Sequence, residues 1–388
     1  MKNTALDPLS LFAAAMVLAV GSTAASVQTA GSQPAAVFPG QQWREASPES
    51  QGVDSAKLEA AVAYMDGRFG SDGAKELVII RNGYLIWQGP HVDAYHNIWS
   101  ATKTFTSTLL GLMIADRKCS LDDFAVTHLP HLDDRYTIYN RIRLRHLASM
   151  SSGYKGELVD VTPEQPWGDP MRYLNPTAPL FAAGTRVQYH DHQVFVLGQI
   201  LTRLAGEPMK DVFKRRVAEP IGLTRWDWGV SGKVDGIELN NAAGTPSKVP
   251  GVQITAREMA RYGLLYLNRG RWNGKQILPA SFADEAGKNQ VPGIGQSSFL
   301  HGRYGLYWWT NDVMPSGKRP WPAAPPKAYT AHGHGGNFCY VIPRWNMVVV
   351  RMGTTPIGKS PEADALWNGF FAKLADALGV GRGPAAST

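Results

Sequence analysis

Cysteine is nearly absent from this sequence, and several other signals are missing with it. Only Cys119 and Cys339 occur in the 388 residues, so a disulfide scaffold is excluded and we expect two buried thiols. The histidines and cysteines show neither a His-Glu-x-x-His pattern nor a close Cys pair, so we expect no metal site. No repeat of fixed period occurs, which excludes solenoids and propellers.

The charge of the chain is also unexceptional. Lys and Arg number 39 against 32 Asp and Glu, a formal net charge of +7, and the densest basic stretches, 141–145 and 214–216, are short. A diffuse charge of this kind argues against nucleic acid as a partner. A hydrophobic content of 44% with 10% aromatic residues predicts a packed globular protein.

The first 25 residues have the features of an export signal. Lys2 is followed by an apolar run from Leu9 to Val20 and by small residues at 23–25. Because about 20 apolar residues are needed to span a bilayer, we expect no permanent membrane anchor. We therefore expect an exported protein, periplasmic or secreted, with residues 26–40 as a flexible leader.

The rest of the chain alternates strand-rich and helix-rich regions. Residues 76–88 predict a hairpin around Asn82-Gly83, and residues 100–117 predict an apolar helix. Strand signals are missing from 118 to 249. They return at 304–309, 329–332, 338–342 and 346–352, and further helices are predicted at 55–67, 194–204, 255–267 and 362–378. We predict one α/β (α+β) domain over 41–385, in which 41–117 and 250–385 form the sheet part and 118–249 is an inserted all-helical subdomain.

A Ser-x-x-Lys pattern begins the apolar helix at Ser100. Residues three apart share a helix face, so Ser100 and Lys103 would be neighbours, and a serine beside an amine is an activated nucleophile. The alternative is an ordinary helix N-cap serine. A second match, Ser152 to Lys155, lies in a turn with no apolar helix after it, so we favour Ser100.

An ordered set of blocks resembles a known family. The blocks are HNIWSATKTFT (96–106), IRLRHLASMSSG (142–153), GTRVQY (184–189), EPIGL (219–223) and HGGN (334–337). In this order they resemble the serine β-lactamase and penicillin-binding-protein-like superfamily, in its class C β-lactamase, esterase and 6-aminohexanoate-dimer hydrolase-like branch, over about residues 43–380. The resemblance implies an antiparallel sheet flanked by helices and no cofactor.

The resemblance also implies roles for single residues. Ser100 would be the nucleophile, with Lys103 and Tyr189 sharing the general base and acid roles. The backbone amides of Ser100 and Asn337 would form the oxyanion hole.

Two positions depart from the family pattern. Asp191 stands where the family usually has asparagine, and a carboxylate beside Lys103 favours the charged lysine, which shifts the base role toward Tyr189. His334 stands where β-lactamases and peptidases hold a substrate carboxylate with lysine, and a histidine is mostly uncharged at neutral pH. His334, Gly335 and Gly336 are expected to contact substrate, as is Asp191.

These residues predict a serine hydrolase that cleaves an ester or amide of a small-molecule or peptide-like substrate through an acyl-serine. A β-lactamase or D-Ala-D-Ala carboxypeptidase is the alternative, and a non-catalytic peptidoglycan-binding member is a further one. The oligomeric state stays open. The aromatic run at 307–309 fits strand-core packing better than a pocket wall.

Overall fold

The structure is a computed structural model that describes residues 36–163, 168–244, 248–296, 303–358 and 361–380. The predicted export signal and residues 26–35 of the predicted leader lie outside these residues. The chain from residue 36 onward forms one compact unit. None of the helices in the described ranges is long and apolar enough to span a bilayer.

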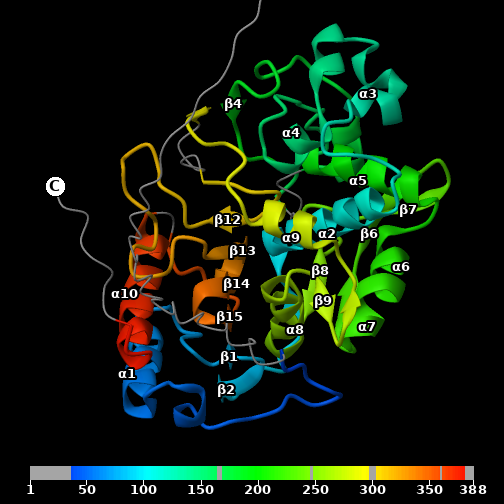
Figure 1. Ribbon diagram of the computed structural model, residues 1–388. Coiled ribbons are helices and arrows are strands. Elements are labelled where there is room, and N and C mark those ends of the chain that lie inside the picture. The colour runs from blue at the N-terminus through cyan, green and yellow to red at the C-terminus, as the bar shows by residue number, and fades with distance from the viewer. Residues whose placement is uncertain (1–35, 164–167, 245–247, 297–302, 359–360, 381–388) are drawn as a thin grey trace, which may run out of the picture. The chain divides into compact units, whose positions relative to one another are not determined.

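A six-stranded antiparallel sheet is the centre of the fold (Figure 1). Its strands, in spatial order, are β12 (Trp309–Thr310), β13 (Tyr329–Gly333), β14 (Asn337–Ile342), β15 (Met347–Arg351), β1 (Leu77–Arg81) and β2 (Tyr84–Gln88). β1 pairs with β15 and β2, so the two sequence regions predicted to form the sheet do so. In the predicted turn Asn82 and Gly83 have φ values of 53° and 85°, as a tight two-residue hairpin requires.

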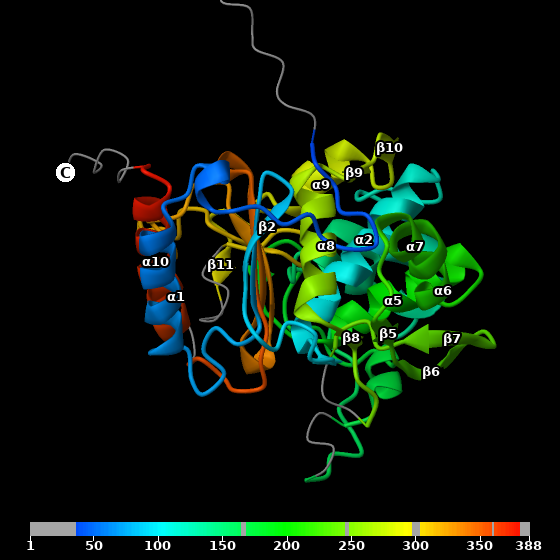
Figure 2. The same ribbon diagram turned by 90° about the horizontal axis from the view of Figure 1, so that it is seen from below.

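Helices cover both faces of this sheet (Figure 2). α1 (Ser55–Asp66) and α10 (Glu362–Ala377) pack together on one face, and α8 (Ala256–Leu267) lies on the other. α8 sits close because it carries Gly263, where an added Cβ would lie 2.7 Å from both Cys339 Sγ and Val348 Cγ1. Both cysteines are free and buried, as predicted.

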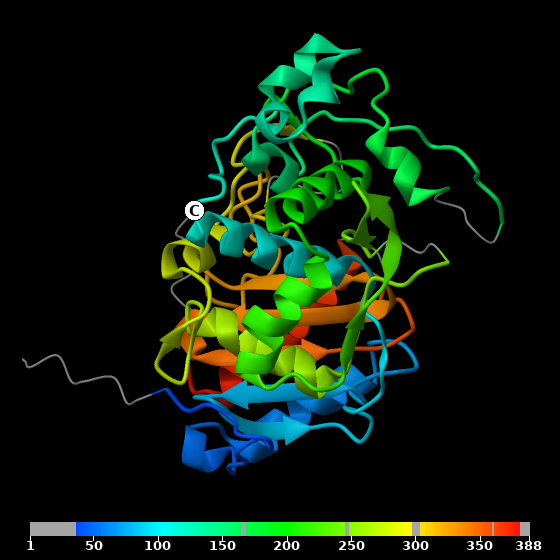
Figure 3. The same cartoon turned by 90° about the vertical axis from the view of Figure 1, so that its right-hand side faces the viewer.

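Helices of the inserted region pack against α2 (Thr102–Ala115) (Figure 3). The helices of this region are α3 (Ala125–His128), α4 (Leu144–Ala148), α5 (His192–Ala205), α6 (Met209–Phe213) and α7 (Glu219–Ile221); α9 (Ala280–Ala286) follows later in the chain. The short strands outside the main sheet are β3 (His96–Asn97), β4 (Arg186–Val187), β5 (Trp226–Trp228), β6 (Val230–Val234), β7 (Ile237–Asn240), β8 (Val252–Ile254), β9 (Arg271–Trp272), β10 (Lys275–Gln276) and β11 (Gly295–Gln296).

The prediction that residues 118–249 are all helical is wrong. β4 to β7 fall inside this range, with β5 in a small sheet of order β3-β8-β5 and β6 paired with β7. The β6–β7 turn is Asp235-Gly236, with φ values of 51° and 81°, which is itself a hairpin signal. The strands escaped detection because they are short and half-exposed, so they contain no long apolar run.

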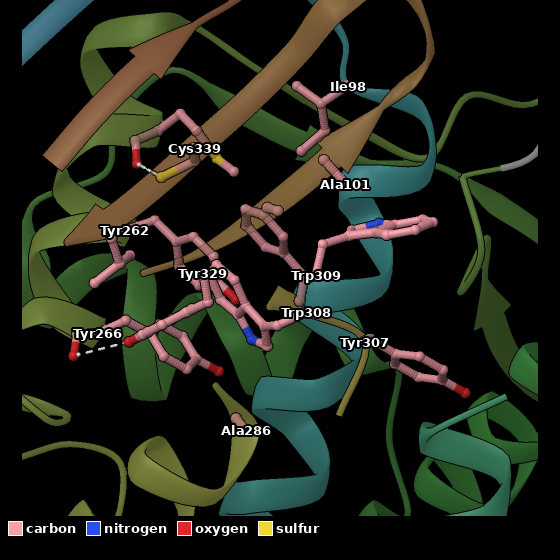
Figure 4. Packing of buried hydrophobic residues seen from close by; sticks show 14 of the residues in the cluster. Ile98, Ala101, Tyr262, Tyr266, Ala286, Tyr307, Trp308, Trp309, Tyr329 and Cys339 are labelled. Carbon is pink, nitrogen blue, oxygen red and sulfur yellow. Dashed lines mark hydrogen bonds between the residues drawn. The ribbon is translucent and has the colours of Figure 1, made fainter. Parts of the chain in front are cut away.

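The predicted strand 304–309 is also shortened, to β12 alone. Tyr307 has a φ of 63°, which interrupts extended backbone before β12. Trp308 packs in the core with Tyr262 and Tyr266 on the α8 side, as Figure 4 shows, whereas the next residue, Trp309, also lines a cavity beside Ser100. Both tryptophans are buried, so the core interpretation is correct, but Trp309 is a pocket wall as well.

Candidate active site

Ser100 lies in a single 3-10 turn, Trp99–Ala101, that leads directly into α2. The turn is fixed at its start by a hydrogen bond from the Ile98 amide to the carbonyl of Val252 in β8. Trp99 has a φ of 52°, an unfavourable value for a bulky side chain, and such strain often occurs at functional sites. Ser100 is not the N-cap of α2, because that position is Ala101. The ordinary N-cap reading of this serine is therefore excluded.

Lys103 is completely buried and holds its ammonium among oxygen atoms. Its Nζ donates to Ser100 Oγ at 3.0 Å and to the carbonyl of Ala243 at 2.8 Å, and it forms an ion pair with Asp191 Oδ1 at 2.7 Å. Burial by itself lowers the pKa of Lys103, but the Asp191 carboxylate and the Tyr189 oxygen outweigh it and raise the pKa above its ordinary value. Lys103 is therefore a charged ammonium at neutral pH, and the sequence-predicted pairing with Asp191 is present.

Tyr189 lies between β4 and α5, against the same lysine. Its ring centroid is 5.0 Å from Lys103 Nζ, and a hydrogen bond with Tyr189 contributes to the raised pKa of Lys103. Trp309 and Tyr304 pack on the ring with centroid distances of 5.9 and 6.2 Å. The structure thus brings Ser100, Lys103 and Tyr189 into one cluster although Tyr189 is distant in sequence.

The end of strand β13 passes close to the Ser100 turn. An added Cβ at Gly333 would lie 1.9 Å from the carbonyl oxygen of Ile98, so only glycine permits this approach. The exposed His334 follows, with its ring edge-to-face on Trp99 at 5.2 Å. A substrate that reaches Ser100 therefore meets the end of β13.

Arg351 is a buried residue of the site that sequence reasoning missed. Its guanidinium donates to the carbonyls of Gly335 and Gly336 at 3.2 and 2.9 Å, and so holds the loop after β13. Those two glycines have φ values of 77° and 80°, which glycine accommodates readily. The sequence feature that could have revealed Arg351 is its position as a charged residue at the end of an otherwise apolar strand, β15 (Met347–Arg351).

Asn337 lies just beyond the loop that follows β13. It opens β14 and pairs with Gly333 at the closed end of the β13–β14 hairpin. Its side-chain amide donates to the carbonyl of His334, and Asn337 is not among the residues that line the cavity at Ser100. The contribution of its backbone amide to the oxyanion hole stays a prediction.

The alternation of β13 indicates a further amide. The carbonyl of Ala328 accepts a hydrogen bond from the amide of Asn311, so Ala328 faces the β12 edge. Successive residues face opposite edges, and Gly333, the last residue of β13, faces β14. Continued one residue beyond β13, this alternation makes the His334 amide a second candidate for the oxyanion hole, beside that of Asn337.

A cavity of about 290 Å³ opens at Ser100. It is lined by Ser100, Tyr189, Arg303, Trp309, Trp321, Thr330, His332, Gly333, His334, Gly335, Gly336, Phe338, Pro356, Ile357, Gly358, Ala363 and Asp364. Five predicted site residues thus line it, namely Ser100, Tyr189, His334, Gly335 and Gly336, whereas Asp191 contacts Lys103. Within the described ranges no group of three His, Cys, Asp or Glu side chains is arranged to hold a metal ion.

Comparisons with known proteins agree with this architecture. The chain is 30% identical over 128 residues to a β-lactamase from Pseudomonas fluorescens, a match that covers 32% of this chain and 34% of that protein; the chain thus spans about a third of that relative. A Bacillus anthracis structure provisionally named as a 6-aminohexanoate-dimer hydrolase superposes with a TM-score of 0.60 at 22% identity, over 78% of this chain and 79% of that chain. EstCE1, a hydrolase with promiscuous acyltransferase activity, superposes with a TM-score of 0.57 at 19% identity, over 86% of this chain and 100% of that chain.

The sequence model of the Beta-lactamase family matches residues 72–372, which is most of the chain. Solved structures of penicillin-binding-protein homologues share the fold, as one from Caulobacter crescentus does with a TM-score of 0.62 at 16% identity, over 84% of this chain and 98% of that chain. The ordered motifs, the antiparallel sheet with flanking helices and the family match lead to one conclusion: this chain belongs to the Beta-lactamase family, a family of serine hydrolases with the fold of β-lactamases and penicillin-binding proteins.

Proposed function

We propose that this protein hydrolyses an ester or amide through an acyl intermediate on Ser100. The observation that carries the proposal is the 3.0 Å hydrogen bond between Ser100 Oγ and the fully buried Lys103 ammonium, with Tyr189 against that ammonium and on the wall of the same cavity. The Ser100 hydroxyl, the positive charge of Lys103 and the Tyr189 oxygen, which can carry a proton, then lie where one substrate carbonyl can reach them.

In the proposed reaction Tyr189 acts as a phenolate held beside the Lys103 ammonium. Ser100 Oγ attacks the carbonyl carbon and gives its proton to this phenolate oxygen. Lys103 is charged, so its role is to stabilise negative charge on the oxygens of Ser100 and Tyr189 rather than to accept the proton. The amides of Ser100 and of His334 or Asn337 would bind the oxyanion, where one lost donor typically costs about 3–4 kcal/mol of barrier. Tyr189 then returns the proton to the leaving alcohol or amine, and water releases the acyl group from Ser100.

One of the two departures from the family pattern, His334, supports an ester or linear amide as the substrate. His334 is exposed and packed on Trp99 at the position where the resemblance implies a carboxylate-binding lysine. A neutral imidazole holds an anion less strongly than an ammonium does. A β-lactam or D-Ala-D-Ala substrate would need that anchor.

A fluorophosphonate probe tests the catalytic part of the proposal. We expect the probe to add to Ser100, as read by peptide mass spectrometry, and to leave the Ser100→Ala variant unlabelled. Ser152→Ala is the matched control, because Ser152 begins the second Ser-x-x-Lys pattern but is buried and donates to Gln193 Oε1 at 2.7 Å. An unlabelled wild type that also hydrolyses no substrate would overturn the proposal and favour the non-catalytic peptidoglycan-binding alternative.

A substrate panel tests the second part. We expect p-nitrophenyl esters or a linear anilide to be turned over with higher kcat/KM than a chromogenic cephalosporin or a D-Ala-D-Ala peptide. The reverse order would overturn the substrate assignment in favour of β-lactamase or carboxypeptidase activity, while leaving Ser100 as the nucleophile.

We also propose that the protein is exported. The support is the composition of residues 1–25: Lys2, the apolar run from Leu9 to Val20 and the small residues after it. Cell fractionation and N-terminal sequencing of the purified protein test this proposal, and an intact Met1 on a cytoplasmic protein would refute it.

A further inference from the structure

The cavity at Ser100 extends to one side of the catalytic cluster. Ser100 and Tyr189 line it, whereas Lys103 and Asp191 are not among its lining residues. In the proposed reaction Tyr189 protonates the leaving group, so a cavity on the Tyr189 side lies where the departing alcohol or amine would be. The acyl group then lies on the other side of the scissile bond.

The walls of this cavity are mainly apolar and aromatic. Trp309, Trp321 and Phe338 supply rings, and Ile357 and Ala363 supply aliphatic surface. His332 also lines the cavity, stacked on Phe338 at 4.2 Å between ring centroids. Burial, together with the positive charge of Arg303, lowers the pKa of His332 to about 3, so this wall is uncharged at neutral pH.

A fixed ion pair lines the cavity beyond these rings. Arg303 Nη2 lies 2.6 Å from Asp364 Oδ2, and the Arg303 side chain is only 2% exposed. Trp321 Nε1 donates to Asp364 Oδ1 at 3.0 Å. The guanidinium carbon lies 5.4 and 5.5 Å from the ring centroids of Trp309 and Trp321, so the charge is held between two rings.

The two charges of this pair compensate each other. A ligand carboxylate placed here would face Asp364 as well as Arg303, and a ligand ammonium would face Arg303 as well as Asp364. In either case the charged group of the ligand would lose its hydration shell, and both protein charges are already paired with each other, so neither would compensate it fully. A neutral group that donates and accepts hydrogen bonds meets neither problem.

We propose, on the basis of the proposed function, that this cavity is the leaving-group subsite and that the substrate is an ester or amide of an aryl or similarly compact apolar alcohol or amine with a neutral polar substituent at its far end. The rings of Trp309, Trp321 and Phe338 bind the apolar body. The Arg303–Asp364 pair binds the neutral polar end and rejects charged ones.

Matched acetate esters test the assignment, because they keep the acyl group constant. We compare 4-(hydroxymethyl)phenyl, 4-carboxyphenyl and 4-(aminomethyl)phenyl acetate, and divide each kcat/KM by the rate of hydrolysis of the same ester by hydroxide. We expect the neutral ester to exceed both charged esters by about tenfold or more. A charged ester that equals or exceeds it would overturn the proposal.

Asp364→Asn tests the charge argument directly. The variant leaves the Arg303 charge uncompensated while an amide oxygen can still accept from Trp321 Nε1. We expect the ratio of the 4-carboxyphenyl to the 4-(hydroxymethyl)phenyl ester to rise about tenfold or more. Asp284→Asn is the matched control, since Asp284 pairs with Arg269 on the exposed surface. An unchanged ratio in folded Asp364→Asn would overturn the role of the pair.

Ala363→Phe tests the cavity without changing a charge. Ala363 lines the cavity from α10, so the larger ring should reduce kcat/KM for the aryl esters by a larger factor than kcat/KM for methyl acetate. Ala365→Phe, at an exposed position of the same helix, is the control, and thermal unfolding verifies that both variants fold. An equal loss on methyl acetate would overturn the subsite. Absence of fluorophosphonate labelling in the wild type would instead refute the proposed function, so the two failures are distinguishable.

Discussion

The ion pair between Lys103 and Asp191 gives the strongest quantitative prediction. Lys103 Nζ and Asp191 Oδ1 lie 2.7 Å apart, and the Lys103 and Asp191 side chains are 0% and 15% exposed. At an effective dielectric constant of about 20 the Coulomb attraction at this distance is about 6 kcal/mol before desolvation. Desolvation removes much of this gain, and breaking one partner of a buried pair typically costs about 3–5 kcal/mol. We therefore expect Lys103→Met and Asp191→Asn each to lower the free energy of unfolding by about 3 kcal/mol.

A double-mutant cycle with denaturant unfolding measures the interaction. The double variant removes both charges, so its loss should be smaller than the sum of the single losses by at least about 2 kcal/mol. Lys210→Met and Asp227→Asn form the control cycle, because that pair is exposed and should couple by less than about 1 kcal/mol. Additive losses at Lys103 and Asp191 would refute the reasoning.

The pH dependence of this coupling has a defined sign. The pKa of Lys103 is raised in the folded protein, so its contribution to stability is fully present below the ordinary lysine pKa and is lost as the pH rises through the raised value. We expect the coupling energy to be the same at pH 6 and pH 9. A coupling that disappears by pH 9 would mean that the lysine is already neutral there.

Three further predictions concern single groups. Gly333→Ala should lower kcat/KM strongly with a smaller effect on stability, since its Cβ would meet the carbonyl of Ile98 at 1.9 Å and move β13 away from the Ser100 turn; unchanged ester kinetics would contradict this. Burial and neighbouring arginines lower the pKa of His146 to about 4, so its folded form resists protonation and stability should fall by about 3 kcal/mol as the pH drops from about 6.5 to 4. In His146→Gln the melting temperature should fall less steeply than in the wild type as the pH is lowered. An equally steep fall would exclude His146 as a source of the acid-induced loss of stability. Burial raises the pKa of Cys119 to about 12 and that of Cys339 further, so iodoacetamide at pH 8 should alkylate both only after denaturation, and labelling of the native protein would show that these thiols are accessible.

Only part of the cluster around Ser100 was predictable from local pattern. Helical spacing alone places Lys103 beside Ser100, whereas Tyr189 and Asp191 were identified by the resemblance of their flanking motifs to the family. Once Asp191 is placed there, its pairing with Lys103 follows from their charges, since a buried ammonium needs a counter-charge.

The remaining features depend on register and backbone direction, which spacing does not determine. Asn337 matches a motif position, yet which backbone amides face Ser100 depends on how the chain turns after β13. Trp308 and Trp309 are adjacent, yet one packs on Tyr262 in the core and the other lines the cavity. The Arg303–Asp364 pair joins residues 61 positions apart, and nothing local in the sequence relates them.

The burial of α2 has a consequence for the durability of the site. Every residue from Thr102 to Met113 is buried, and the hydroxyls of Thr104, Thr106 and Thr108 donate to the carbonyls of Ala101, Ala242 and Thr104. Segments with this many buried contacts open only when the whole protein unfolds, so their amide protons exchange last. We therefore expect α2, which follows the Ser100 turn and carries Lys103, to be among the slowest-exchanging parts of the molecule. Changes in the surrounding loops can then alter what binds without loosening this helix.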